Sequence, residues 1–338
     1  MSRQIDKIMM AHGSGGRFSQ ELFQNVFQPK FSNPFLDEVH DGAILDIEGK
    51  RLAFTTDSYV VSPLFFPGGN IGDLAINGTV NDLAMCGAKP LYLSAGFILE
   101  EGFEIEKLQQ ITQSMSTASE KAGVMVVTGD TKVVENGNAD GVYINTAGIG
   151  LVDQSLDISP KGAKEGDLII INGRIADHGI AILSKREGLD FESDIQSDSA
   201  PLNGLVEVML KTSSDIHVLR DPTRGGIAAT LNEIAEASKL GILIDEQKIP
   251  ISESVISISS LLGIDPLNVA NEGKLLAIVG NKDAEAVLGV MKSHPFGAES
   301  SIIGEIVSNH PGKVVLKTAI GTKRLVDMPS GENLPRIC

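Results

Sequence analysis

The chain has 338 residues, of which 42% are hydrophobic, so it is long enough to bury sizeable cores in two domains. Its 44 acidic and 28 basic residues give a formal net charge of −16. A surface this acidic repels nucleic acids and anionic membranes, and we expect neither among the partners.

The cysteine content and the first residues bear on the expected compartment. Two cysteines, Cys86 and Cys338, do not form a disulfide framework. The opening residues, Met-Ser-Arg-Gln-Ile-Asp, lack the apolar core of a signal peptide. The most apolar long run, residues 83–99, is broken by glycine, lysine and proline and predicts no membrane span. We therefore expect a cytoplasmic protein in which Cys338 stays reduced.

The first predicted elements carry a glycine-rich loop and two aspartates. Residues 12–16, His-Gly-Ser-Gly-Gly, precede an amphipathic helix, and their glycines would let the backbone approach a phosphate, although a plain loop fits equally well. Asp41 follows in a polar turn. Residues 51–59 predict a strand with Asp57 near its end. An unpaired carboxylate at a buried strand end is costly, so we expect a cation close to Asp57.

A helix is predicted between Asn70, a good N-cap, and Gly87, a good stop signal. Asp82 falls in the C-terminal half of this helix, where its charge opposes the helix dipole. This placement favours a carboxylate of a metal site, and a solvated helix residue is the alternative.

The rest of the first half predicts strands around one helix. The elements are, in order, a strand at 91–99, a helix at 104–122, and strands at 124–127 and 142–151. The strand at 124–127 is expected to end in Thr-Gly-Asp-Thr-Lys, which places Asp130 and Lys132 at its C-terminal end. Asp130 is a candidate metal ligand. Lys132 is a candidate for neutralising a phosphate or for positioning a reacting group.

The composition of the sequence changes near residue 155, and residues 159–166, which are rich in turn-forming residues, predict a connector. We place the domain boundary there. The expected parts are an N-terminal domain at 1–155, a C-terminal α/β domain at 156–327 and a mobile tail at 328–338. In the second half, a strand at 168–171 and helices from about 179 and 202 are predicted.

The sharpest motif of the second half is Arg220-Asp-Pro-Thr-Arg-Gly-Gly. It ends an apolar segment and begins a helix, in which Thr223 can cap while Gly225 and Gly226 leave backbone amides free. Helix N-termini bind phosphate well, and Asp221 beside this one suits a bridging metal ion.

Two further residues of the second half leave alternatives open. Glu272, before a predicted strand at 275–279, is either a surface charge or a general base. His178, at a predicted helix start, is interpreted as a cap or packing residue rather than a catalyst.

The last ten residues, Pro-Ser-Gly-Glu-Asn-Leu-Pro-Arg-Ile-Cys, predict an extended tail, because Pro329, Gly331 and Pro335 are poor helix and strand formers. Fully extended, such a run spans roughly 33–36 Å, so its thiol can leave one pocket and reach another surface. Frayed termini are usually polar, and this apolar ending favours a function for Cys338. The sequence contains no P-loop motif and no cysteine–histidine cluster with zinc spacing.

The acids Asp41, Asp57, Asp82, Asp130 and Asp221 together resemble the ATP-binding pattern of the aminoimidazole ribonucleotide synthetase superfamily. Within it, the sequence is similar over essentially its whole length to hydrogenase maturation factors of the HypE family. The segments that carry this resemblance are His12-Gly-Ser-Gly-Gly, Thr56-Asp-Ser-Tyr, Pro63-Leu-Phe-Phe-Pro-Gly-Gly-Asn-Ile-Gly, Asn81-Asp, Gly129-Asp-Thr-Lys-Val, Asp221-Pro-Thr-Arg-Gly-Gly, Asn271-Glu-Gly-Lys and the terminal Pro335-Arg-Ile-Cys.

The resemblance implies a two-domain α/β fold in which a strand-rich N-terminal half forms a homodimer. It also implies ATP and Mg²⁺ near the junction of domains and subunits. The implied metal ligands are Asp57, Asp82, Asp130 and Asp221. The implied nucleotide site adds Asp41, Thr223, Gly225 and Gly226. The implied catalytic residues are Cys338, Glu272 and Lys132.

The reaction that the resemblance implies begins when HypF loads a carbamoyl group onto the terminal cysteine. ATP-dependent dehydration then gives a thiocyanate, and the cyano group passes to iron held by HypC and HypD as a ligand of nickel–iron hydrogenase. Two rival interpretations are an ATP-dependent phosphotransferase that acts on a free small substrate, and a non-catalytic scaffold that docks a partner through its tail.

Overall fold

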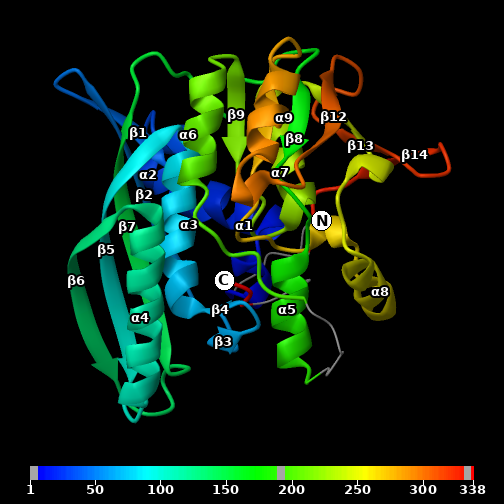
Figure 1. Cartoon of the computed structure of the whole chain (residues 1–338). Coiled ribbons are helices and arrows are strands. Elements are labelled where there is room, and N and C mark those ends of the chain that lie inside the picture. The colour runs from blue at the N-terminus through cyan, green and yellow to red at the C-terminus, as the bar shows by residue number, and fades with distance from the viewer. Residues whose placement is uncertain (1–6, 189–194, 331–335) are drawn as a thin grey trace.

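The computed structural model describes residues 7–188, 195–330 and 336–338. Within them the chain forms two sheets flanked by helices and one short ribbon (Figure 1). The first sheet has the order β1-β2-β7-β5-β6. Its strands are β1 (Ala43–Ile47), β2 (Lys50–Tyr59), β5 (Ala88–Glu100), β6 (Met125–Val134) and β7 (Val142–Val152). The ribbon pairs β3 (Phe65–Phe66) with β4 (Gly69–Asn70).

Helices α3 (Ile71–Met85) and α4 (Ile105–Ala122) cover one face of the first sheet (Figure 1). Helix α3 begins where the sequence predicts, because the Asn70 side chain accepts from Gly72 N (2.8 Å) while Asp73 accepts from Asn70 N (2.7 Å). Nearly every residue of α3 is buried, since the helix also contacts the second domain through α6.

The opposite face of the first sheet is open in the single chain. A row of exposed apolar side chains crosses four strands at matching register: Phe54, Ile149, Tyr92 and Met125, which are 44%, 37%, 41% and 59% exposed. The edge strand β6 is exposed along nearly its whole length. An open apolar face beside an exposed strand edge is typical of a surface that another chain covers.

The second sheet has the order β14-β13-β10-β12-β8-β11-β9. Its strands are β8 (Leu168–Ile171), β9 (Ile216–Arg220), β10 (Gly241–Asp245), β11 (Leu276–Val279), β12 (Ser301–Val307), β13 (Val314–Lys317) and β14 (Lys323–Val326). Alternating residues enter different cores: Ile169 and Ile278 point to one, Ile170 and Ala277 to the other. The central strands β8 and β11 are therefore buried on both faces.

The helices of the second domain supply these two cores. One core includes side chains from α5 (Asp177–Arg186), α7 (Gly226–Ser238) and α8 (Glu253–Leu262). The other includes side chains from α6 (Asn203–Thr212) and α9 (Ala284–Lys292). No helix among the described residues is both long and apolar enough to cross a membrane.

One expectation about the local structure of the first domain is wrong. The strand after α4 does not end before Gly129: β6 runs through Asp130 and Lys132, because each residue pairs with β5, opposite Gly96 and Ile98. The predicted N-terminal helix exists as α1 (Gly16–Leu22), a π-helical turn (Phe23–Phe27) and α2 (Gln28–Phe31). Its apolar residues, however, find no core in the single chain, and Val26 is 52% exposed.

Candidate active site

One cavity of about 270 Å³ gathers most of the acidic residues predicted from the sequence. The acids reach it from different elements: Asp57 lies on β2, Asp82 on α3 and Asp221 directly after β9. The full lining is Gly15, Asp41, Thr55, Thr56, Asp57, Gly78, Asp82, Arg220, Asp221, Thr223, Arg224, Thr230, Glu233, Glu272 and Cys338. Six acidic residues and two arginines face one another here, so the wall is strongly electronegative when all are ionised.

Crowding of the buried carboxylates changes their protonation. Burial, followed by the charges of Asp221 and Asp57, raises the pKa of Asp82 well above its usual value, although Thr55 Oγ1 donates to its carboxylate (2.8 Å). Burial and the charge of Asp41 raise the pKa of Asp221 to about 8. These groups are therefore poised to bind a cation, which would favour their ionised forms.

Arg224 supplies the positive charge expected near Asp57, and Arg220 compensates Asp41. Arg220 Nε lies 2.8 Å from Asp41, and its other end holds Glu233 (2.7 Å). Burial alone would raise the pKa of Asp41, but Arg220 and His40 hold it below its usual value. Burial raises the pKa of Asp57 above its usual value, and the charge of Arg224 opposes this shift. Arg224 was not among the site residues predicted from the sequence, although it lies inside the motif that begins at Arg220.

The glycine-rich loop and the start of α7 meet at this cavity. Arg224 Nη1 donates to Gly13 O (3.0 Å), and Gly15 is part of the cavity wall. Helix α7 begins at Gly226 after Gly225, whose φ of 80° favours glycine. The expected cap by Thr223 is wrong, because Gly225 is the N-cap residue and no side chain of the described residues caps the first amides of α7. Both predicted phosphate-binding segments therefore lie beside the acids.

The end of the tail is docked against β2, which places Cys338 in the cavity. Val60 N donates to Cys338 O (3.0 Å) and Ser62 N donates to Arg336 O (3.2 Å), so the tail pairs with the chain that follows β2. Ile337 between them is 2% exposed. Residues 331–335, which include Gly331 and Pro335 of the predicted extended tail, lie outside the described part of the chain.

Side chains from both domains hold the docked tail. His178 Nε2 donates to Ile337 O (2.9 Å), and burial lowers the pKa of His178, which favours this neutral ring. Arg186 donates to Arg336 O (2.8 Å), and Arg336 forms an ion pair with Asp140. His178, interpreted from the sequence as a cap or packing residue, is buried against Phe66 and also contacts the tail.

Docking suppresses ionisation of the thiol. Burial raises the pKa of Cys338 far above its ordinary value, Arg224 opposes this shift, and Glu272 and Asp57 add to it. The docked cysteine is therefore a neutral thiol at physiological pH.

We expect loss of the ion pair between Arg336 and Asp140 to loosen the tail. Arg336→Ala and Asp140→Asn remove it from opposite sides, and a partly exposed pair contributes roughly 0.2–1 kcal/mol. Each change should raise the rate at which an aromatic disulfide reagent modifies Cys338 up to about fivefold. Cys86 is fully buried, so it should add little to the signal. Unchanged rates in both variants would show that this pair does not contribute to docking.

Asp130 and Lys132 are not brought to the cavity within the single chain. They lie on β6, both 69% exposed, and pair with each other (2.6 Å). By register Asp130 shares the open face of the sheet with Asn145 and Ser58. Their predicted roles with metal and phosphate stay predictions.

Comparison with known proteins identifies the family. The model of the AIR synthase related protein N-terminal domain matches residues 39–152, and that of the C-terminal domain matches 164–317. The chain is 53% identical over 333 residues to carbamoyl dehydratase HypE of Rhizobium leguminosarum bv. viciae, with 98% of this chain and 95% of that protein covered. The chain belongs to the HypE family of carbamoyl dehydratases.

Two solved HypE structures agree with this assignment. One, a HypE–HypF complex, is 49% identical with a TM-score of 0.87 and covers 91% of this chain and 99% of its own. The other, a hydrogenase maturation protein HypE in complex with ATP, is 49% identical with a TM-score of 0.83 and covers 98% and 100%. The resemblance and the two-domain α/β fold class expected from the sequence are confirmed.

Within this HypE-family site, Glu272 has a buried carboxylate with one unpartnered oxygen. Its side chain is 4% exposed, and Oε1 has no hydrogen-bond partner among the described residues. Burial, followed by the charges of Asp221 and Asp57, raises the pKa of Glu272 well above its usual value. Of the two alternatives left by the sequence, a surface charge is excluded by this burial.

Proposed function

We propose that this chain uses ATP to dehydrate a carbamoyl group carried by its own Cys338. The observation that supports this most directly is the docking of Cys338 into the cavity that holds Glu272 and the aspartates. A docked terminal residue occupies space that a free small substrate would need, so the geometry favours this reaction over phosphotransfer to a free substrate. The buried acids likewise have no use in a non-catalytic scaffold, because burying them is costly.

The proposed chemistry first makes the amide oxygen of the thiocarboxamide a good leaving group. That oxygen attacks the γ-phosphorus of ATP, a C–O–P bond forms and ADP leaves. Removal of the two N–H protons then lets phosphate depart with the C–O electrons, which leaves S–C≡N on the cysteine. Glu272 Oε1 has no hydrogen-bond partner among the described residues, so it is available to accept a proton, and this supports the assignment of Glu272 as the base.

Bound Mg²⁺ fits the acids of the cavity. The raised pKa values of Asp82 and Asp221 reflect uncompensated negative charge, and carboxylates are ligands that Mg²⁺ prefers. Among the described residues no group of three or more histidine, cysteine, aspartate or glutamate side chains is arranged to hold a metal ion. The phosphates of the nucleotide would therefore have to supply part of the coordination. We propose that Asp57, Asp82 and Asp221 would contribute carboxylate oxygens to such an ion, which would offset the charge of the triphosphate.

We further propose that the chain functions as a homodimer through the open face of its first sheet. The exposed row from Phe54 to Met125 and the unpaired edge of β6 support this pairing. Asp130 and Lys132 lie on the same face, so a second copy is the element that would bring them to a partner's nucleotide. Sedimentation of the purified protein tests the dimer, and a monomer at micromolar concentration would contradict it.

We propose HypF as the enzyme that loads Cys338 and a HypC–HypD complex as the acceptor of cyanide, in the cytoplasm. A relative of this family is known in complex with HypF. Both cysteines of this chain are unpaired, which suits a reducing compartment.

The deciding experiment follows the mass of Cys338. The protein is incubated with HypF, carbamoyl phosphate and Mg·ATP, and its intact mass is followed over time. The proposal expects a carbamoyl adduct that loses one water when Mg·ATP is present. An adduct that persists, or none at all, would contradict it.

Removing acids of the proposed metal site should have opposite effects on binding and stability. Asp82→Asn and Asp221→Asn should each weaken Mg·ATP binding about tenfold or more, because each replaces a negatively charged ligand of the divalent ion with a neutral one. Titration calorimetry measures this, and unchanged affinity in both variants would reduce these acids to structural residues.

The stability effect has a defined pH dependence. Folded Asp221 keeps its proton up to about pH 8, whereas the unfolded group loses it near its ordinary value of 3.8. The folded state therefore binds more protons between these values, and the free energy of unfolding falls as pH rises through them. In the absence of nucleotide, Asp221→Asn should flatten that fall, as denaturant unfolding at pH 5 and pH 8 would show.

A further inference from the structure

The main chain of Glu272 is held from two sides by buried side chains. Asp198 Oδ1 accepts the N–H of Glu272 (3.0 Å), and Asn81 Nδ2 donates to its carbonyl (3.2 Å). The carboxylate of Glu272 contributes nothing to this anchoring through Oε1, which has no partner among the described residues. The position of the proposed base is therefore set through its backbone, while its side chain stays available.

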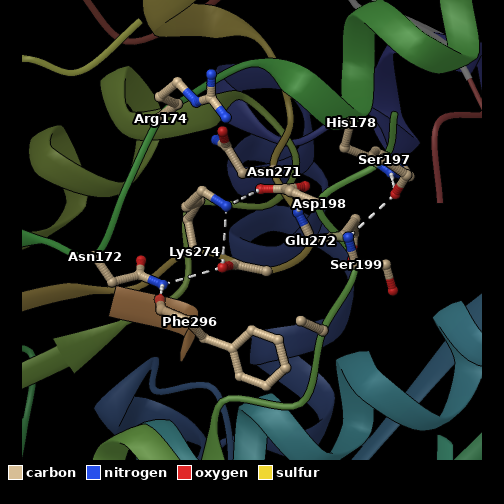
Figure 2. Close-up of polar contacts among 12 residues, drawn as sticks. Asn172, Arg174, His178, Ser197, Asp198, Ser199, Asn271, Glu272, Lys274 and Phe296 are labelled. Atoms are coloured by element: carbon tan, nitrogen blue, oxygen red, sulfur yellow. Dashed lines mark hydrogen bonds and ion pairs between the residues drawn. The ribbon is translucent and has the colours of Figure 1, made fainter. Parts of the chain in front are cut away.

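Asp198 is in turn held by Lys274, which lies two residues after Glu272 in the chain (Figure 2). Lys274 Nζ lies 2.8 Å from Asp198 Oδ2, and the two side chains are 12% and 6% exposed. A Cβ atom at Gly273, between Glu272 and Lys274, would clash with the carbonyl oxygen of Asp198. The two segments therefore touch backbone to backbone, and only glycine permits this approach.

Ser197, the residue before Asp198, is linked to the docked tail through His178. Ser197 Oγ donates to His178 Nδ1 (2.7 Å), and the opposite ring nitrogen donates to Ile337 O. Ser197 and Asp198 are thus adjacent residues with different partners. Ser197 is linked through His178 to the tail that carries Cys338, and Asp198 is hydrogen-bonded to the backbone of Glu272. Figure 2 shows Ser197, Asp198 and Glu272 of this series, with Lys274 pointing at Asp198.

We propose that Asp198 and Lys274 form a positioning pair for the dehydration step: Lys274 holds Asp198, and Asp198 holds the Glu272 amide in the place from which its carboxylate reaches the carbamoyl nitrogen. This inference rests on the proposed function. It adds two residues to it that touch neither the substrate nor the nucleotide cavity, since neither lines that cavity.

Stability alone does not account for this pair. Desolvating two charges costs about as much as their attraction returns, and an apolar pair of similar volume is often equally stable. What an apolar pair would lack is the second oxygen of Asp198, which accepts from Glu272 N. The site therefore needs the hydrogen-bond acceptor that Asp198 offers to Glu272 N, rather than the ion pair between Asp198 and Lys274.

The test compares two uncharged replacements that differ only in that acceptor. Asp198→Asn combined with Lys274→Gln keeps an oxygen for the Glu272 amide, and Asp198→Leu combined with Lys274→Gln removes it. Neither leaves an unpaired buried charge. Single-turnover dehydration of carbamoylated Cys338 is followed by intact mass, Mg·ATP affinity by calorimetry, and folding by thermal unfolding.

We expect the Asn-containing pair to dehydrate within about threefold of the wild-type rate. The Leu-containing pair should be slower by tenfold or more, because displacement of a reacting group by about 1 Å costs up to about 10²-fold. Mg·ATP affinity and carbamoyl loading should stay within about twofold in both. If Asp198 and Lys274 only stabilised the fold, their replacement would also lower thermal stability or Mg·ATP affinity. A loss of dehydration rate alone, which is restored when residue 198 is Asn rather than Leu, indicates positioning.

Glu299→Gln provides the matched control. Glu299 and Asp198 both line a second cavity, of about 370 Å³, which is separate from the one that holds Cys338. Glu299 pairs with Arg174 (2.9 Å) and does not contact Glu272. It should dehydrate at the wild-type rate. Equal rates in the two replacement pairs would overturn the positioning role alone. A wild-type protein that binds Mg·ATP but leaves Cys338 carbamoylated would overturn the proposed function and this inference with it.

Discussion

Cys338→Ala is expected to abolish carbamoyl loading and thiocyanate formation while leaving Mg·ATP affinity within about twofold of wild type. The substitution removes only the sulfur, and the docked tail is held mainly through its backbone, by Val60, Ser62 and His178. The acids and the glycine-rich turns belong to other segments. Intact mass after incubation with HypF measures loading, and calorimetry measures nucleotide affinity.

Cys86→Ala is the control for the loss of a thiol. Cys86 is fully buried at the end of α3 and does not line the cavity, so loading should persist. A Cys338→Ala protein that loses nucleotide affinity would contradict the separation between the thiol-bearing tail and the nucleotide site. Persistent product formation on a free substrate would instead support the phosphotransferase interpretation.

Much of the fold was predictable because its signals are local. The cap at Asn70, the buried run of β8 and the glycine pair before α7 each determine an element from a few neighbouring residues. Convergence of the acids was expected from the resemblance to the aminoimidazole ribonucleotide synthetase superfamily rather than from local signals. Polar residues placed next to buried strands and on a buried helix need partners, and a shared polar cavity supplies them.

Contacts between distant segments were not predictable in the same way. Asp130 lies within β6 because of its pairing with Gly96, and no nearby residue reports that pairing. The docked tail depends on contacts such as Arg336 Nε to Val60 O, across 276 positions of sequence. Asp198 carried no motif at all, since its role comes from a turn that is close to it only in the folded chain.

Glu272→Gln is expected to slow dehydration by about 10²–10⁴-fold, the usual contribution of general base catalysis. Loading of Cys338 should continue, so the carbamoylated protein should accumulate in the presence of Mg·ATP. Intact mass over time separates the two steps. Glu233→Gln is the control: this acid lines the same cavity, but its carboxylate is bound to Arg220, and its loss should affect the rate far less.

The pH dependence of the rate distinguishes a base from an acid that serves only packing. Burial first, then Asp221 and Asp57, raise the pKa of Glu272, so the group acts as a base only as pH rises through that raised value. The wild-type rate should therefore show an acid limb that is absent in Glu272→Gln. Asp57→Asn should shift the limb to lower pH, because it removes one of the charges that raise this pKa.

The same shift has the opposite consequence for stability. Folded Glu272 holds its proton more tightly than the unfolded group, so the free energy of unfolding falls as pH rises from about the ordinary value of 4.5 towards the folded pKa. Glu272→Gln should therefore be the more stable protein at pH 8 and the less active one. A variant that is less active and also less stable at that pH would indicate a structural carboxylate, because a buried base destabilises the fold in the ionised form that catalysis requires.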